Sequence, residues 1–171
     1  MNKQLILCIE TNSNANTDYV YINETINRFY LNNPRTRREI IYLKGKTNYD
    51  KHEEDIDYSK RHFRGETIVI MFIDIDNYDS NPEDIKRWKK IESYCRQMNY
   101  ELVFFTKDVE DVYLGHRISN NDKVKESVRF RAKRLMDSVD ETKLRREQIT
   151  PHSSNVLLIL DKYLDKKKKA K

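Results

Sequence analysis

The segment 67–73, Thr-Ile-Val-Ile-Met-Phe-Ile, is the feature of this chain that most limits its possible folds. It is continuous, apolar and rich in β-branched residues, which is typical of a strand buried on both faces of a sheet. The segment 4–10, Gln-Leu-Ile-Leu-Cys-Ile-Glu, has the same character. Strands that are covered on both faces occur mainly in parallel sheets with helices above and below. The two segments therefore predict a parallel sheet inside an α/β domain.

Segments with helical periodicity alternate with strand-like segments along the rest of the chain. Further strands are expected at 38–43 and 101–106, and helices at 17–31, 49–63, 82–99, 108–115, 123–135 and 155–164. This alternation predicts a three-layer α/β sandwich with a mainly parallel central sheet of about four strands and right-handed crossovers. We expect residues 1–164 to form this one domain and residues 165–171 to be a basic, disordered tail.

The composition argues against several other classes of protein. Only three glycines and three prolines are present, which disfavours a turn-rich β-sandwich. No apolar run is long enough to span a membrane and no signal peptide is visible, so we expect a cytoplasmic protein without a membrane partner. Cys8 and Cys95 lie in a predicted strand and a predicted helix, so we expect buried free thiols rather than a disulfide.

Acidic residues follow the two strongest strands at the point where each strand ends. Glu10 closes the first, and Asp74 and Asp76 follow the second. Residues i and i+2 of a strand point the same way, so Asp74 and Asp76 can face one site, and Glu10 reaches it if the strands are neighbours. Oxygen ligands suit Mg²⁺. The alternative is that Asp-x-Asp only solvates the turn or caps the next helix.

A further acidic group, Asp108, Glu110 and Asp111, follows the strand 101–106. Parallel strands end at the same edge of a sheet, so these side chains are expected near the first site, where Glu110 could hold a second ion. The alternative is that they complement the dipole of the helix that begins there.

These residues resemble a Toprim domain, the catalytic core of topoisomerases, primases and several nuclease families. Glu10 and Asp74-Ile75-Asp76 match the Glu and the Asp-x-Asp that hold Mg²⁺ in that family. The chain is similar to the RloB-like branch, which is linked to bacterial restriction and phage-defence loci. That likeness rests on short motifs over most of the chain, at 17–21, 109–114, 131–135 and 153–156. One difference is Thr11, which follows Glu10 where the branch has a glycine.

Basic residues near these motifs are candidates for contacting a polyanion, which a net charge of +5 also weakly suggests. Lys133 matches the Ala-Lys of the branch and is the strongest candidate for a phosphate contact. The others are Arg131, Arg134, Arg117 and Lys107. The alternative is that Arg131, Lys133 and Arg134 only form the solvated face of an amphipathic helix. Trp88, among lysines and arginines, is expected either to stack on a base or to lie in the core.

The leading functional hypothesis is a phosphodiester nuclease that uses Mg²⁺, or Mn²⁺, on DNA or RNA, in phage defence or mobile-element biology. The alternative is a non-catalytic subunit that binds nucleic acid or protein within a larger defence complex. Small Toprim-like chains often work beside a larger ATPase, and nothing here resembles a Walker A motif, so that partner would be another polypeptide. The sequence is also compatible with a homo-oligomer. A receiver-like phosphotransfer protein is disfavoured, because only Glu10 follows the first strand.

Overall fold

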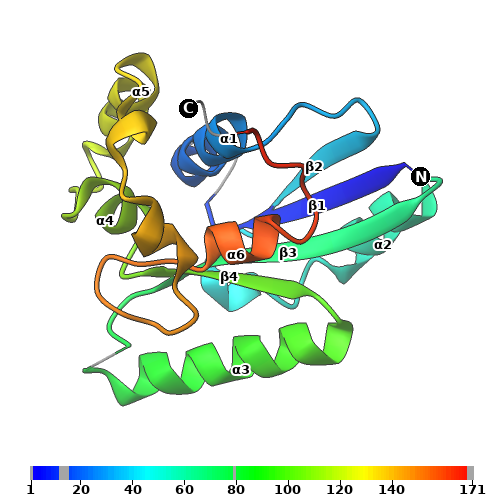
Figure 1. The fold of residues 1–171 in the computed structure, drawn as a ribbon. Helices are drawn as coiled ribbons and strands as arrows, with labels where there is room; N and C mark the ends of the chain where they lie inside the picture. The colour runs from blue at the N-terminus through cyan, green and yellow to red at the C-terminus, as the bar shows by residue number, and fades with distance from the viewer. Residues whose placement is uncertain (1, 12–15, 79, 169–171) are drawn as a thin grey trace.

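A computed structural model of the chain describes residues 2–11, 16–78 and 80–168. Its centre is a four-stranded sheet in the order β2-β1-β3-β4, in which every neighbouring pair is parallel (Figure 1). This confirms the predicted α/β fold with a parallel sheet. The strands are β1 (Lys3–Ile9), β2 (Thr36–Tyr42), β3 (Glu66–Ile75) and β4 (Glu101–Thr106).

Helices cover both faces of this sheet, and α3 lies on the opposite side from α1 and α6 in Figure 1. The α-helices are α1 (Thr17–Phe29), α2 (Glu53–Arg61), α3 (Pro82–Met98), α4 (Val109–Leu114), α5 (Lys123–Ala132) and α6 (Val156–Leu160). Short 3₁₀ helices are η1 (Lys46–Asn48), η2 (Leu135–Ser138) and η3 (Glu141–Arg145).

Side chains of the central strands alternate between two separate cores. In β1, Leu5 and Leu7 pack with residues of α1, α4, α5 and α6, while Ile6 and Cys8 pack with residues of α2 and α3. All four are fully buried, as expected for strands that contribute to both cores. Burial of one such apolar side chain stabilises the folded state by roughly 1.5–3 kcal/mol. The runs in the sequence are continuously apolar because both faces of these strands enter a core.

The order of the strands creates a switch point between β1 and β3. The chain leaves β1 through α1 to reach β2 on one side, and β3 then pairs with β1 on the other side. In open parallel sheets, ligands bind in the crevice outside the carboxyl ends of the strands at such a point. Ile9, the last residue of β1, is level with Phe72, so β3 continues three residues beyond it, to Ile75.

Several predicted helices are shorter than expected. The helix predicted at 49–63 is α2, which spans Glu53–Arg61. The helix predicted at 123–135 ends at Ala132, because Arg134 adopts a left-handed conformation with φ of 52° that starts η2. The closing helix predicted at 155–164 covers Val156–Leu160. Amphipathic periodicity continues past each of these ends, so it does not mark where the backbone turns.

The residues that follow Leu164, where the sequence analysis places the domain boundary, are hydrogen bonded to the end of α1. The amide of Leu31 donates to the carbonyl of Asp165 at 2.8 Å, and the amide of Lys167 donates to the carbonyl of Phe29 at 2.8 Å. The ordered part therefore extends at least to Lys167, while residues 169–171 of the predicted tail lie outside the described residues.

Other expectations about buried residues are met. Cys8 and Cys95 are both buried free thiols. Trp88 is buried and lies edge-to-face with Phe104, so it belongs to the core and not to a base-stacking surface. Within the described part of the chain, no helix combines the length and the apolar character needed to cross a membrane.

Replacement of Gly65 by alanine is expected to destabilise the fold. A Cβ at this position would collide with the carbonyl oxygen of Asn2, whose backbone accepts the hydrogen bond from Glu66 that aligns the start of β3. Because backbone cannot move aside as a flexible side chain can, we expect a loss of about 1–3 kcal/mol in the free energy of unfolding. Urea denaturation of Gly65→Ala measures it. Gly45→Ala separates backbone strain from the collision, because its φ of 116° also disfavours an L residue while its Cβ meets only the Asn48 side chain at 3.9 Å.

Candidate functional site at the carboxyl edge of the sheet

The structure brings the three predicted carboxylates to the switch point. Glu10 follows β1, and one of its carboxylate oxygens accepts a hydrogen bond from the backbone N–H of Asp74 at 3.1 Å. Asp74 lies within the extension of β3 beyond β1, and Asp76 follows the end of that strand. Glu10, Asp74 and Asp76 are all half-buried. The expectation that β1 and β3 are neighbours, on which this grouping depended, is therefore met.

Burial and mutual repulsion disfavour the charged forms of Asp74 and Glu10. Burial, followed by the charge of Glu10, raises the pKa of Asp74 well above its usual value. Burial also raises the pKa of Glu10, although the charge of Lys46 and the Asp74 amide act in the opposite direction. A nearby cation would therefore favour the charged forms of both carboxyls.

A fourth carboxylate, that of Asp18, belongs to the same group. The helix α1 begins at Thr17, so Thr17 and Asp18 both lie in its first turn. Asp18 is buried, and its carboxylate accepts a hydrogen bond from the hydroxyl of Thr17 at 3.2 Å. Burial, followed by the charges of Glu110 and Glu10, raises the pKa of Asp18 to about 7.

The acids after β4 divide into two roles. Asp108 caps α4, since its carboxylate accepts from the amide of Asp111 at 2.8 Å, as the helix-terminus alternative predicted. Glu110 is fully buried, and one of its oxygens accepts from Nζ of Lys123 at 2.8 Å. Its other oxygen, Oε1, is buried and has no hydrogen-bond partner. Lys123 opens α5 and also lies 4.0 Å from Asp108.

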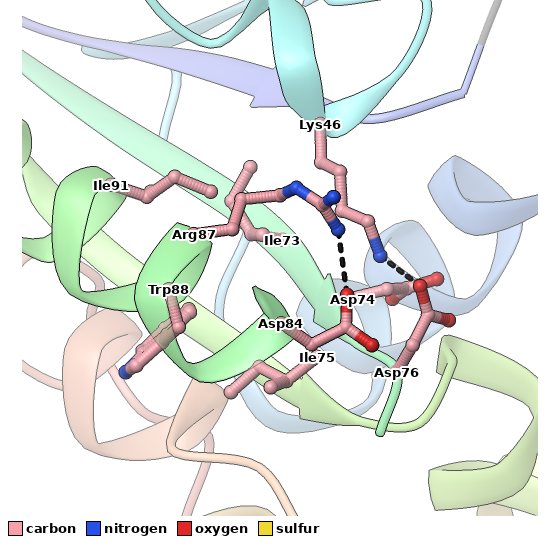
Figure 2. Close-up of a pocket in the computed structure, with 9 residues that line it drawn as sticks. All are labelled: Lys46, Ile73, Asp74, Ile75, Asp76, Asp84, Arg87, Trp88 and Ile91. Carbon is pink, nitrogen blue, oxygen red and sulfur yellow. Dashed lines mark hydrogen bonds and ion pairs between the residues drawn. The ribbon is translucent and has the colours of Figure 1, made fainter. Parts of the chain in front are cut away.

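Two cations hold the most exposed carboxylate of the site. Lys46, on η1 directly after β2, is hydrogen bonded to Asp76, and Figure 2 shows its side chain reaching across the end of β3. Arg117 lies 3.6 Å from Asp76 and 3.5 Å from Asp108, so it links the ends of β3 and β4. In the same view Arg87 pairs with Asp84 at 2.7 Å on α3. Lys46, Asp74, Asp76, Asp84 and Arg87 are among the residues that line a hollow of about 10 Å³, which admits a single water at most.

The side chains fit a divalent cation by chemical type, but they are not closed around one. Carboxylate oxygens are the ligands that Mg²⁺ prefers, and the orphaned Oε1 of Glu110 is a buried acceptor without a donor. Among residues 2–11, 16–78 and 80–168, however, no group of three or more carboxylates, imidazoles or thiolates is arranged so that it could hold a metal ion. Binding would therefore require Glu10, Asp74 and Asp76 to close on the ion.

The five predicted nucleic-acid contacts fall into two places. Lys107 and Arg117 lie at the acidic edge: the amide of Lys107 donates to the carbonyl of Ile75 at 2.9 Å, and Arg117 contacts Asp76. Arg131, Lys133 and Arg134 are exposed and lie at the far end of α5, about 12–16 Å from Lys123 at 1.5 Å per residue. Arg131 and Arg134 do not share a helical face, because the helix ends between them.

Asp18, Lys46 and Lys123 were not identified from the sequence as site residues. Each directly adjoins the end or the beginning of an element: Asp18 is in the first turn of α1, Lys46 follows β2 and Lys123 opens α5. The position of Lys46 after a parallel strand was a usable signal, since all strands of a parallel sheet end at one edge. The loop and α5, which bring Lys123 back to Glu110, left no comparable pattern.

Comparisons with known proteins add no functional assignment. No protein-family model matches the chain, and no curated protein matches it. A de novo designed Rossmann fold protein is similar at 12% sequence identity, with 76% of this chain and 97% of that chain covered and a TM-score of 0.33. A likeness at that TM-score carries no argument, so the fold class rests on the parallel sheet and its flanking helices.

Proposed function

We propose that this protein is a Mg²⁺-dependent phosphodiester nuclease acting on DNA or RNA, with Mn²⁺ as an alternative ion. The observation that carries the proposal is the hydrogen bond between Glu10 and the Asp74 amide, because it holds acids from two strands together at the switch point. A role in phage defence or mobile-element biology, beside a larger ATPase, is supported by the sequence resemblance alone, and a cytoplasmic location by the hydropathy pattern of the sequence alone.

Each side chain at the edge has a role in this proposal. Asp74 and Asp76 would hold the ion, and Glu110 would support a second one. The ion, when bound, supplies Lewis acidity that neutralises charge on the phosphate and lowers the pKa of water. Glu10 would be a further ligand of the ion or would accept the proton of the attacking water as a general base. Lys46 and Arg117 lie beside Asp76 and would attract the phosphate.

A non-catalytic binding subunit is the second candidate, and a specific observation favours it. Lys46 and Arg117 pair with Asp76, and Lys123 pairs with Glu110, so protein cations already neutralise part of the acidic edge. A site completed in this way can bind a partner without any ion.

Substitution of the central carboxylates separates the two candidates. Asp74→Asn and Glu10→Gln are each expected to lower cleavage of labelled DNA or RNA in Mg²⁺ by at least about 10²-fold, because each removes a group that acts on the reacting phosphate or water. Asp50→Asn is the matched control, since Asp50 is exposed and takes part in none of the ion pairs at the acidic edge. Circular dichroism checks that the variants fold.

Two outcomes would contradict the nuclease proposal. One is cleavage that persists in Asp74→Asn. The other is a wild-type protein that never cleaves in Mg²⁺ or Mn²⁺, together with oligonucleotide binding that Asp74→Asn leaves unchanged or strengthens. The second outcome is the one expected for a binding subunit.

A further inference from the structure

Lys166 and Lys167, near the end of the described residues, contact the end of α1. Tyr30 and Lys166 form an isolated antiparallel bridge, and the amide of Lys167 donates to the Phe29 carbonyl at 2.8 Å. The ammonium group of Lys167 also donates to the carbonyl of Asn27, in the last turn of α1, at 2.6 Å. Figure 1 shows this segment running from α6 back to α1.

Two hollows with cationic walls adjoin this segment. One has a volume of about 440 Å³ and the other about 230 Å³. Arg28 and Lys167 line both, so the hollows are adjacent, and together we call them the basic groove. The cations that line it are Arg28, Arg134, Arg145, Lys166, Lys167 and Lys168.

Acidic side chains in the groove position its cations and do not cancel them. Asp161 is the main example: it accepts from Tyr30 at 2.8 Å, lies 2.8 Å from Lys166 and is paired with Arg145. Although burial opposes it, the bonds from Lys166, Arg145 and Tyr30 lower the pKa of Asp161, so it stays charged. Six cations face four carboxylates across the two hollows, which leaves an excess of positive charge.

The basic groove adjoins the end of α5. Arg134 lies 3.7 Å from Asp137, which Arg28 of α1 contacts at 2.9 Å, so this corner of the groove is built by α1 and η2 together. Exposed Arg131 and Lys133 precede Arg134 along the chain. From there α5 leads back to Lys123 and the acidic edge. Arg129, Arg131 and Lys133 thus lie along the chain between the groove and Lys123, which contacts Glu110 at the acidic edge.

We propose that the basic groove binds the phosphodiester backbone of a nucleic acid and holds it so that the strand passes along α5 toward the acidic edge. Closely spaced, fixed arginines and lysines are the groups that contact phosphates without reading sequence. The choice of nucleic acid as the polyanion rests on the proposed function. The groove itself contains none of the residues assigned to catalysis, so its binding can be measured without cleavage.

The test is the affinity of short fluorescein-labelled single-stranded DNA and RNA, measured by fluorescence anisotropy in EDTA. Arg134→Glu/Lys168→Glu is expected to weaken binding at least tenfold and to reduce the slope of log affinity against log salt by about two, one for each lost phosphate contact. Lys89→Glu/Lys90→Glu on the exposed face of α3 changes the net charge equally and should weaken binding less than about twofold.

Arg134→Gln/Lys168→Gln removes the two charges without reversing them and is a control for misfolding of the first variant. Its affinity should lie between that of the first variant and that of the wild type. Equal weakening by the groove and α3 variants would overturn the proposal, because it would show a response to net charge alone. The proposal would also be overturned if the wild type bound neither oligonucleotide. The same holds if it bound phosphatidylserine vesicles more tightly than both oligonucleotides. If the wild type binds the oligonucleotides in EDTA but does not cleave them in Mg²⁺, the nuclease proposal is contradicted and the proposal for the basic groove is still supported.

Discussion

Replacement of Asp18 by asparagine is expected to stabilise the protein above pH 7 and to reduce the pH dependence of its stability. Burial and the charges of Glu110 and Glu10 raise the pKa of Asp18 from 3.8 to about 7. Between these values the folded state binds a proton that the unfolded state does not, so the free energy of unfolding decreases as pH rises through this range. Above the range the wild type carries an unfavourable charge, at a cost on the order of a few kcal/mol, which asparagine lacks.

Thermal unfolding of wild type and Asp18→Asn across pH about 4 to 8 measures this effect. The wild type should lose stability toward the upper limit, and the variant should lose less. Part of the slope should remain, because the pKa values of Asp74 and Glu10 are raised in the same direction. Asp50→Asn, at an exposed position, should retain the wild-type slope. A variant that is less stable than wild type above pH 7 would show that Asp18 is stabilised by a partner, such as a bound cation.

Replacement of Lys123 by methionine is expected to destabilise the fold by about 3–5 kcal/mol. Lys123 donates to the fully buried Glu110 at 2.8 Å, and the other oxygen of that carboxylate already lacks a partner. Methionine keeps the apolar length of the side chain and removes only the charge, so Glu110 is left as an uncompensated buried carboxylate. Such a loss is a large fraction of the total stability of a typical domain.

A double-mutant cycle tests this explanation. Glu110→Gln combined with Lys123→Met should recover most of the lost stability, because no buried charge is then left without a partner. Lys125→Met is the matched control: it makes the same substitution at an exposed position of the same helix and should change stability by less than about 0.5 kcal/mol. If the double variant is as unstable as Lys123→Met alone, the loss does not come from the unpaired charge of Glu110.

The same cycle bears on the two proposed functions. If added Mg²⁺ or Mn²⁺ raises the unfolding temperature of Lys123→Met more than that of the wild type, the ion replaces the ammonium group beside Glu110. That outcome would indicate that Lys123 occupies the place of a second ion in the wild type. If neither protein responds, Glu110 serves the fold and does not hold a metal.

The local sequence was sufficient for the sheet and for three carboxylates of the site. The apolar runs at 4–10 and 67–73 predict strands buried on both faces, because only such strands lack a polar face. Once these strands are parallel and adjacent, the acids that follow them must lie at one edge, and Glu10 and Asp74 do so. The alternation of strands and helices gave the fold class by the same local logic, although it misplaced helix ends such as that of α5 at Ala132.

What the sequence determined by itself was therefore periodic: the strands, the helices, and the acids that follow buried strands. Only the tertiary structure decided which charges meet. It brought Lys123 of α5 to Glu110 of α4, Lys46 to Asp76, and the lysines after α6 to the end of α1. The physical reason is that burial and strand pairing act on neighbouring residues and leave a repeating pattern in the sequence. Contacts between charges depend instead on how loops return through space, and no local pattern records that path.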